Sequence, residues 1–123
     1  MSASGFDLAF EDFRIGCALD LQDPALAERF LRGAIARVPS SAAAHEQLGI
    51  ALAQQSRTTE AIVMLERATQ LAPQDASARF VLAMAYLQHN QPSEAHAQLV
   101  AVIQIDPDYP DAAHWLAQLD GFR

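Results

Sequence analysis

The sequence contains no lysine, one cysteine and few glycines, and each scarcity excludes some classes of protein. Cys17 alone cannot form an internal disulfide, and it has no Cys-x-x-Cys partner for a redox or zinc site. The five glycines are scattered, so they form no phosphate-binding loop. No apolar run approaches the roughly 18–20 residues that span a bilayer, and the first residues are unlike a secretory signal. These features favour a cytoplasmic protein.

Positive charge is also in short supply. Eight arginines stand against fifteen aspartates and glutamates, which gives a formal net charge of -7. Nucleic acids and anionic membrane surfaces are bound through clusters of Lys and Arg. We therefore expect neither a nucleic acid nor a membrane as a partner.

Alanine, in contrast, is abundant, with 25 among the 123 residues. The larger apolar residues make up roughly a third of the chain, which is enough for a core and too much for intrinsic disorder. Alanine is the best helix former, and its small side chain lets helix axes approach one another. The composition therefore favours closely packed helices.

Residue types recur at a spacing of 34 along most of the chain. Such a period is typical of repeat proteins, in which each unit buries its apolar face against the next. Leucine, alanine and proline each recur at this spacing, and one column holds only small residues. The matching columns are Leu48, Leu82 and Leu116; Gly49, Ala83 and Ala117; Ala27, Ala61 and Ala95; Leu31, Leu65 and Leu99; and Pro39, Pro73 and Pro107.

Each unit has apolar residues at the 3.6-residue period of a helix, interrupted at a turn and at a proline. The pattern predicts an all-α chain, and no segment shows convincing strand alternation. The expected helices span residues 6–21, 24–37, 42–54, 59–71, 76–89, 92–105 and 111–120.

The ends of these helices carry recognisable signals. Ser41 (with Ser40 as the alternative), Thr58 and Asp75 are predicted N-caps, because their side chains can accept hydrogen bonds from free backbone N–H groups. Asn90 is expected in a left-handed turn, and Pro92 in the first turn of the helix that follows.

These columns resemble the tetratricopeptide repeat, whose 34-residue unit has a Leu-Gly pair in its first helix and Ala, a large apolar residue and Pro in its second. His45 and Arg79 stand where the family usually has Trp. The resemblance implies a single domain over residues 1–123, a right-handed superhelical array of antiparallel helix pairs. Its units are about 6–39, 42–75 and 76–109, with a capping helix at 110–121. The best-matching unit supplies Leu48, Gly49, Leu52, Ala61, Leu65, Ala68 and Pro73.

The resemblance further implies that the first helices line a concave groove that binds a peptide segment of a partner protein. Residues offset from the packing stripe form the candidate groove, which is mainly apolar and contains several aromatic residues. Such a surface favours an apolar-rich peptide or helix as its ligand. The candidates are Phe10, Phe13, Cys17, Ala43, Glu46, Ile50, Ala53, Ser77, Phe80, Met84, Leu87, His114, Trp115 and Gln118.

Some members of the family hold the C-terminal carboxylate of a chaperone with Lys, Asn and Arg side chains. The corresponding stripe in this sequence has no basic residue, and Glu46 would repel a carboxylate. We therefore predict no binding to such tails. The stripe consists of Phe13, Cys17, Glu46, Ile50, Ser77 and Val81.

Catalytic, metal and cofactor sites are not predicted. The four histidines have no ligand spacing on a common helix, and no nucleophile elbow occurs, so they are interpreted as surface or packing residues. Cys17 is more simply a small apolar group in the core or groove. Glu28 and Arg32 are expected to form an exposed i,i+4 ion pair with no further role.

Three functions stay open on this sequence. The first, which we favour, is a non-catalytic adaptor or scaffold that binds a peptide in its groove. The second is a dedicated chaperone that shields an apolar segment of one client with the same groove. The third is a structural module that forms a homodimer through its apolar surface. An enzyme is the least favoured reading.

Overall fold

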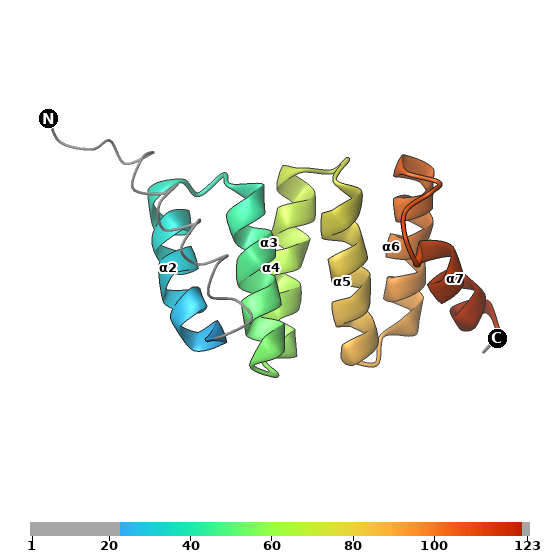
Figure 1. The fold of residues 1–123 in the computed structure, drawn as a ribbon, viewed down its shortest axis with the longest axis horizontal. Coiled ribbons are helices and arrows are strands. Elements are labelled where there is room, and N and C mark those ends of the chain that lie inside the picture. Colours follow the sequence, from blue (N-terminus) through green and yellow to red (C-terminus); the bar gives the residue numbers. More distant parts are fainter. Residues whose placement is uncertain (1–22, 122–123) are drawn as a thin grey trace, which may run out of the picture.

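The computed structural model describes residues 23–121, and that range is almost entirely helical (Figure 1). The predicted helix over residues 6–21 lies outside the described residues, together with its groove candidates Phe10, Phe13 and Cys17. The described helices are α2 (Pro24–Arg37), α3 (Ala42–Gln54), α4 (Thr58–Leu71), α5 (Ala76–Gln88), α6 (Pro92–Ile105) and α7 (Ala112–Asp120).

The 34-residue period is visible in the hydrogen bonds that begin the helices. The Ser41 side chain accepts a 3.2 Å bond from the backbone N–H of Ala44, and Asp75 accepts a 3.2 Å bond from that of Ala78. Both predicted N-caps are confirmed. Because the two caps stand one period apart, α3 and α5 start in the same register.

The turns inside the two described helix pairs also share one geometry. Asn90 has a φ of 58°, as predicted, and Ser56, one period earlier, has a φ of 62°. In the first turn the N–H of Arg57 donates to the carbonyl of Leu52 at 2.9 Å, and the second turn has the equivalent bond at 2.8 Å. This closure reverses the chain within three residues, so the paired helices run antiparallel.

Three helix boundaries differ from the prediction. Thr58 was expected as an N-cap but is the first residue of α4, because the left-handed Ser56 ends the turn early and leaves Arg57 as the cap. Asp111 was expected inside the last helix but is its left-handed N-cap, with no side-chain capping bond. Helix α5 ends at Gln88, one residue earlier than expected.

Each helix packs against its neighbours in the chain, from α2 on α3 through to α6 on α7, and α3 also contacts α5. Figure 1 shows them standing side by side in one row. The predicted all-α array of helix pairs is therefore confirmed for the described residues. No helix within residues 23–121 is long and apolar enough to cross a membrane.

Two of the repeating columns form the centre of this packing. The alanine column lets neighbouring helices approach closely, and the leucine column fills the space between them. All six side chains are fully buried: Ala27, Ala61, Ala95, Leu31, Leu65 and Leu99.

The two helices of one pair, α3 and α4, approach each other closely at Gly49. A Cβ atom at this position would lie 2.5 Å from Cγ of Leu65 and 3.2 Å from the carbonyl oxygen of Ala61. Leu65 is fully buried and cannot swing away. Glycine is therefore required here by the distance between α3 and α4.

Replacing Gly49 by Ala tests this contact. Overpacking costs about 1–3 kcal/mol, more than the roughly 1 kcal/mol that alanine gains over glycine in a helix. We expect a lower Tm by circular dichroism. Gly121→Ala is the control, because its added Cβ would meet nothing nearer than 3.4 Å. A Gly49→Ala protein as stable as the wild type would contradict the close packing of α3 on α4.

Candidate functional site

A shallow apolar cleft of about 270 Å³ opens between α3 and α5, the first helices of two successive pairs. Ile50 and Met84 occupy equivalent positions one period apart in its walls, and so do Gln54 and Gln88 at one end. The buried Leu65 of α4 contributes to the lining. The complete lining is Ile50, Ala53, Gln54, Leu65, Val81, Met84, Ala85 and Gln88.

Helical spacing explains why these residues line the cleft. Val81, Met84 and Gln88 follow one another at intervals of three and four residues, so they share one stripe of α5. A second stripe of the same helix, with Leu82 and Tyr86, is buried in the core. Packing of that stripe leaves the other stripe to form the cleft.

Glu46 lies one helical turn before Ile50, near the end of the cleft opposite the glutamines. Its residue exposure is only 9%, and its Oε1 accepts a hydrogen bond from Oγ of Ser77 at 3.1 Å. Burial raises the pKa of this carboxyl and the nearby Asp75 adds to the rise, while the bond from Ser77 opposes it. Among the described residues, Glu46 forms no ion pair.

Only part of the predicted groove comes together in this cleft. Ile50, Ala53 and Met84 line it, and Glu46 and Ser77 lie at its end. Val81, expected on the neighbouring stripe, also lines it. The glutamines and Ala85 were not predicted, although the same 34-residue shift that relates Ile50 to Met84 relates Gln54 to Gln88.

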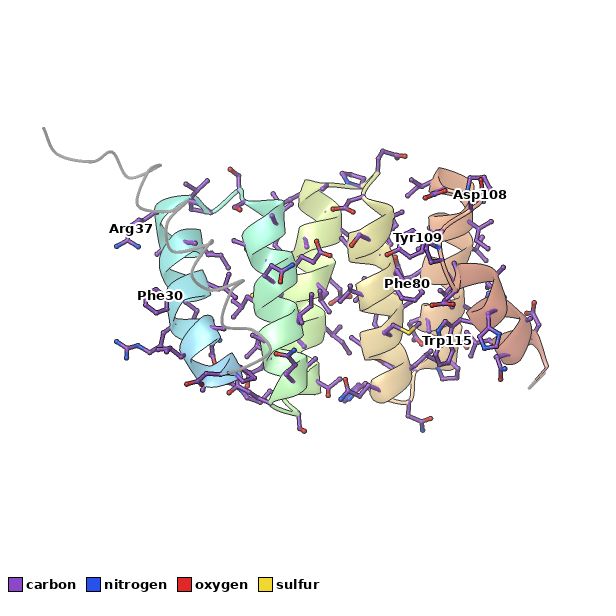
Figure 2. All side chains as sticks on the ribbon, viewed as in Figure 1. Phe30, Arg37, Phe80, Asp108, Tyr109 and Trp115 are labelled. Atoms are coloured by element: carbon purple, nitrogen blue, oxygen red, sulfur yellow. The ribbon has the colours of Figure 1, made fainter. Side chains whose placement is uncertain are left out.

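Phe80 and Leu87 do not line the cleft; both are partly buried and pack against the core around α5 and α6. The Phe80 ring lies 5.1 Å from that of Tyr109, in the segment between α6 and α7 (Figure 2). Phe80 therefore helps to hold the last helix in place. A charged substitution there would disturb the packing of the segment before α7.

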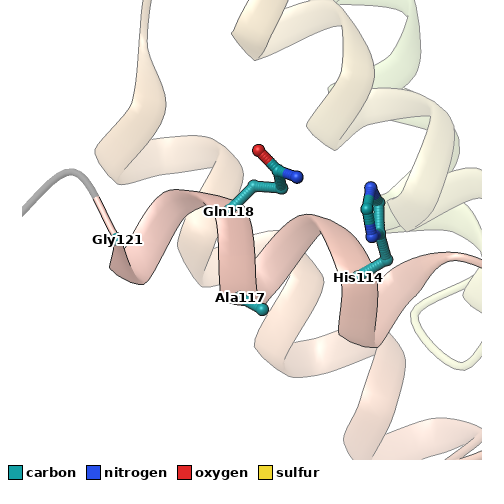
Figure 3. Close-up of a pocket in the computed structure, with 4 residues that line it drawn as sticks. All are labelled: His114, Ala117, Gln118 and Gly121. Atoms are coloured by element: carbon teal, nitrogen blue, oxygen red, sulfur yellow. The ribbon is translucent and has the colours of Figure 1, made fainter.

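The candidates on α7 also lie elsewhere. His114 and Gln118, with Ala117 and Gly121, line a separate hollow of about 380 Å³ (Figure 3). Trp115 is 36% exposed, and its ring centroid lies 6.2 Å from that of His114. These residues form a second surface at the end of the array.

Two of the remaining histidines, His45 and His96, have structural partners. The buried ring of His45 lies with Nδ1 2.8 Å from the carbonyl oxygen of Ser41, and His96 lies 3.1 Å from a carboxylate oxygen of Asp120. Within residues 23–121, no group of three or more His, Cys, Asp or Glu residues is arranged to hold a metal ion.

The expectation that Glu28 pairs only with Arg32 on an exposed face is wrong. Glu28 does bind Arg32 at 2.8 Å, but it also accepts bonds from Arg57 at 2.7 Å and from Gln55 at 3.2 Å. These last two contacts link α2 to the turn after α3. Burial opposes the ionised form, yet the three hydrogen bonds outweigh it and lower the pKa of Glu28.

The raised pKa of Glu46 leads to a testable prediction about how the stability of the fold depends on pH. A carboxyl whose folded pKa exceeds its unfolded value contributes stability below the unfolded pKa, and this is lost as pH rises through the folded pKa. We therefore expect Glu46→Gln to gain stability over the wild type as pH rises from 4 to 7, by urea unfolding. Glu94→Gln, which removes an equal charge at an exposed position of α6, is the matched control. A Glu46→Gln protein that loses stability relative to the wild type as pH rises would contradict the assignment.

Comparison with known proteins agrees with this architecture. Two family profiles, each described as a tetratricopeptide repeat, match residues 52–119 and 18–76. No curated protein matches the chain significantly.

Solved structures of low sequence identity share the fold. The Arabidopsis OM64 TPR domain superposes with a TM-score of 0.92 at 15% identity, covering 98% of this chain and 100% of that one. The first TPR of Spaghetti (RPAP3), bound to the HSP90 peptide SRMEEVD, gives 0.90 at 14% identity, covering 95% and 94%. The TPR2B domain of yeast Sti1, in a complex with pHsp70, gives 0.88 at 20% identity, covering 95% and 99%. With more than half of the sequence matched by one family profile and the helix pairs stacked at the family's period, the chain belongs to the tetratricopeptide repeat family.

Proposed function

We propose that this protein is a non-catalytic interaction module that binds an apolar-rich peptide or helix of a partner protein in the groove lined by its first helices. It would act as an adaptor or scaffold. A dedicated chaperone would use the same groove, and the identity of the client would distinguish the two roles.

The observation that carries this proposal is the open apolar cleft between α3 and α5. Ile50, Val81 and Met84 are only partly buried there, although they stand beside a well-packed core. Grouped apolar side chains at a soluble surface are typical of a binding site. Methionine is also flexible and polarisable, which suits contacts with varied apolar side chains.

Membership of the family supports the same function. Two of the structures with this fold are complexes, one with an HSP90 peptide and one with pHsp70. Because their sequence identity to this chain is low, these structures support only a shared fold. The partner of this chain must therefore be inferred from the chemistry of its own groove.

A homodimer is the second candidate, and the surface of α7 favours it. Trp115 is one of two large apolar side chains that are substantially exposed in the described part of the chain. Closed homodimers are usually symmetric, so the Trp115 surfaces of two copies would be buried against each other. Light scattering after size-exclusion chromatography distinguishes a dimer from a monomer.

A random dodecapeptide display library provides ligands for a test of the groove. We expect peptides enriched on the wild-type protein to lose at least about tenfold in affinity for Met84→Asp, because a buried carboxylate in an apolar contact is costly. Fluorescence anisotropy measures the change. Val63→Asp is the matched control, since Val63 is 53% exposed on α4 and lies outside the cleft.

Equal binding to Met84→Asp and the wild type would contradict the groove as the site. Circular dichroism of both variants establishes that any loss of binding is not a loss of fold.

We also expect no binding of the peptide SRMEEVD, which occupies one of the related structures. The described part of the expected clamp stripe offers Glu46, Ile50, Ser77 and Val81, none of which is a cation. Isothermal titration at a protein concentration of about 100 μM should give no signal, since the Kd would lie above roughly 1 mM on the scale of weak affinities. Micromolar binding would contradict the prediction.

A further inference from the structure

The apolar cleft has a negative charge at one end only. Glu46 stands one turn beyond Ile50 on α3, and Ser77 stands one turn beyond Val81 on α5. The hydrogen bond between Glu46 and Ser77 therefore joins the two walls at that end. The opposite end carries the neutral amides of Gln54 and Gln88.

Within the described residues, no cation neutralises Glu46. Arg79 lies on α5, two residues after Ser77, but its guanidinium donates to the carbonyl of Pro73 at 2.9 Å and to Gln98 of α6 at 3.0 Å. Arg57 is paired with Glu28 and Glu60 near the other end of α3. The nearest charged influence on Glu46 is another carboxylate, Asp75.

One oxygen of Glu46 is left free to accept a bond. Oε1 takes the hydrogen bond from Ser77, and Oε2 has no partner in the described part of the chain. No buried side-chain oxygen or nitrogen there lacks a partner, so Oε2 must be reachable from solvent. An ionised carboxylate accepts several hydrogen bonds, and a guanidinium or ammonium group makes the strongest of them.

A largely buried carboxylate without a cation carries an unfavourable desolvation cost in the isolated protein. A cation brought by a ligand would offset that cost only in the complex, which turns it into a source of selectivity. The net charge of -7 acts in the same direction, because it favours the approach of a basic segment.

We propose that the cleft selects a segment in which an Arg or Lys lies beside apolar residues, with the cation on Glu46 and the apolar side chains against Ile50, Val81 and Met84. This inference rests on the proposed function and adds the charge of the ligand to it. One helical turn is about 5.4 Å, so the basic residue should precede or follow the apolar anchor by about two residues in an extended peptide or four in a helix.

The selected peptides of the dodecapeptide library test this charge preference. We expect the sequences enriched on the wild-type protein to contain Arg or Lys at that spacing from an apolar residue. Glu46→Gln keeps an oxygen for Ser77 and removes only the charge, so it should weaken their binding about tenfold, as expected for one hydrogen bond between charged groups. Glu94→Gln changes the net charge equally but lies on α6 outside the cleft, and it should leave affinity unchanged.

A change in the peptide gives the same test without altering the protein. Replacing the basic residue of a selected peptide by glutamine should also weaken binding about tenfold. If the basic side chain of the peptide touches Glu46, the loss of binding free energy should not double when both changes are combined. Such non-additivity is the signature of direct coupling in a double-mutant cycle.

The outcomes separate this inference from the proposed function. Enriched peptides that depend on Met84 but lack a basic residue, or that bind Glu46→Gln as tightly as the wild type, would overturn the charge preference and leave the groove function intact. Failure to enrich any peptide that depends on Met84 would overturn both. A wild-type dimer that Met84→Asp dissociates would place a second copy in the cleft and also overturn the inference.

Discussion

The structure depends on the close contact between neighbouring helices that small residues allow every 34 positions. A single helix pair has more apolar surface than its own contact can bury, so each pair must pack on the next. Gly49 lets Leu65 pack against α3, and the fully buried Ala61 and Ala95 let the second helices of their units approach their neighbours closely. The row of helices in Figure 1 is the consequence of this one requirement.

The same packing creates the cleft. When α3 and α5 turn one stripe each into the core, a second stripe is left where no helix of the described chain covers it. Ile50 and Met84 are equivalent by the repeat, so the cleft is a product of the period and not of a special insertion. Glu46 breaks this equivalence, because the position one period later is Phe80. Its carboxyl group therefore makes one end of the apolar cleft different from the other.

Local signals were sufficient to predict most of the helices, because caps and turns depend on residues a few positions apart. Ser41, Asp75 and Asn90 are examples. The prediction of Thr58 as an N-cap was wrong, because the left-handed turn residue is Ser56 and not a glycine or asparagine, which would have indicated such a turn.

Contacts between residues far apart in the sequence could not be predicted from these local signals. Glu28 meets Arg57 only after α2 has packed on α3. Among the groove candidates, helical spacing grouped Ile50 and Met84, which both line the cleft. It could not tell that the Phe80 ring would pack on Tyr109, since that contact depends on how the chain turns after α6.

Nuclear magnetic resonance of the methyl groups tests the central claim most directly. A peptide selected on the wild-type protein would be titrated into protein with labelled Ile, Val and Met methyls. The account predicts that the signals of Ile50, Val81 and Met84 shift with bound fraction, while the signal of Val63 on the other side of α4 stays in place. Shifts at Val63 with none in the cleft would contradict it.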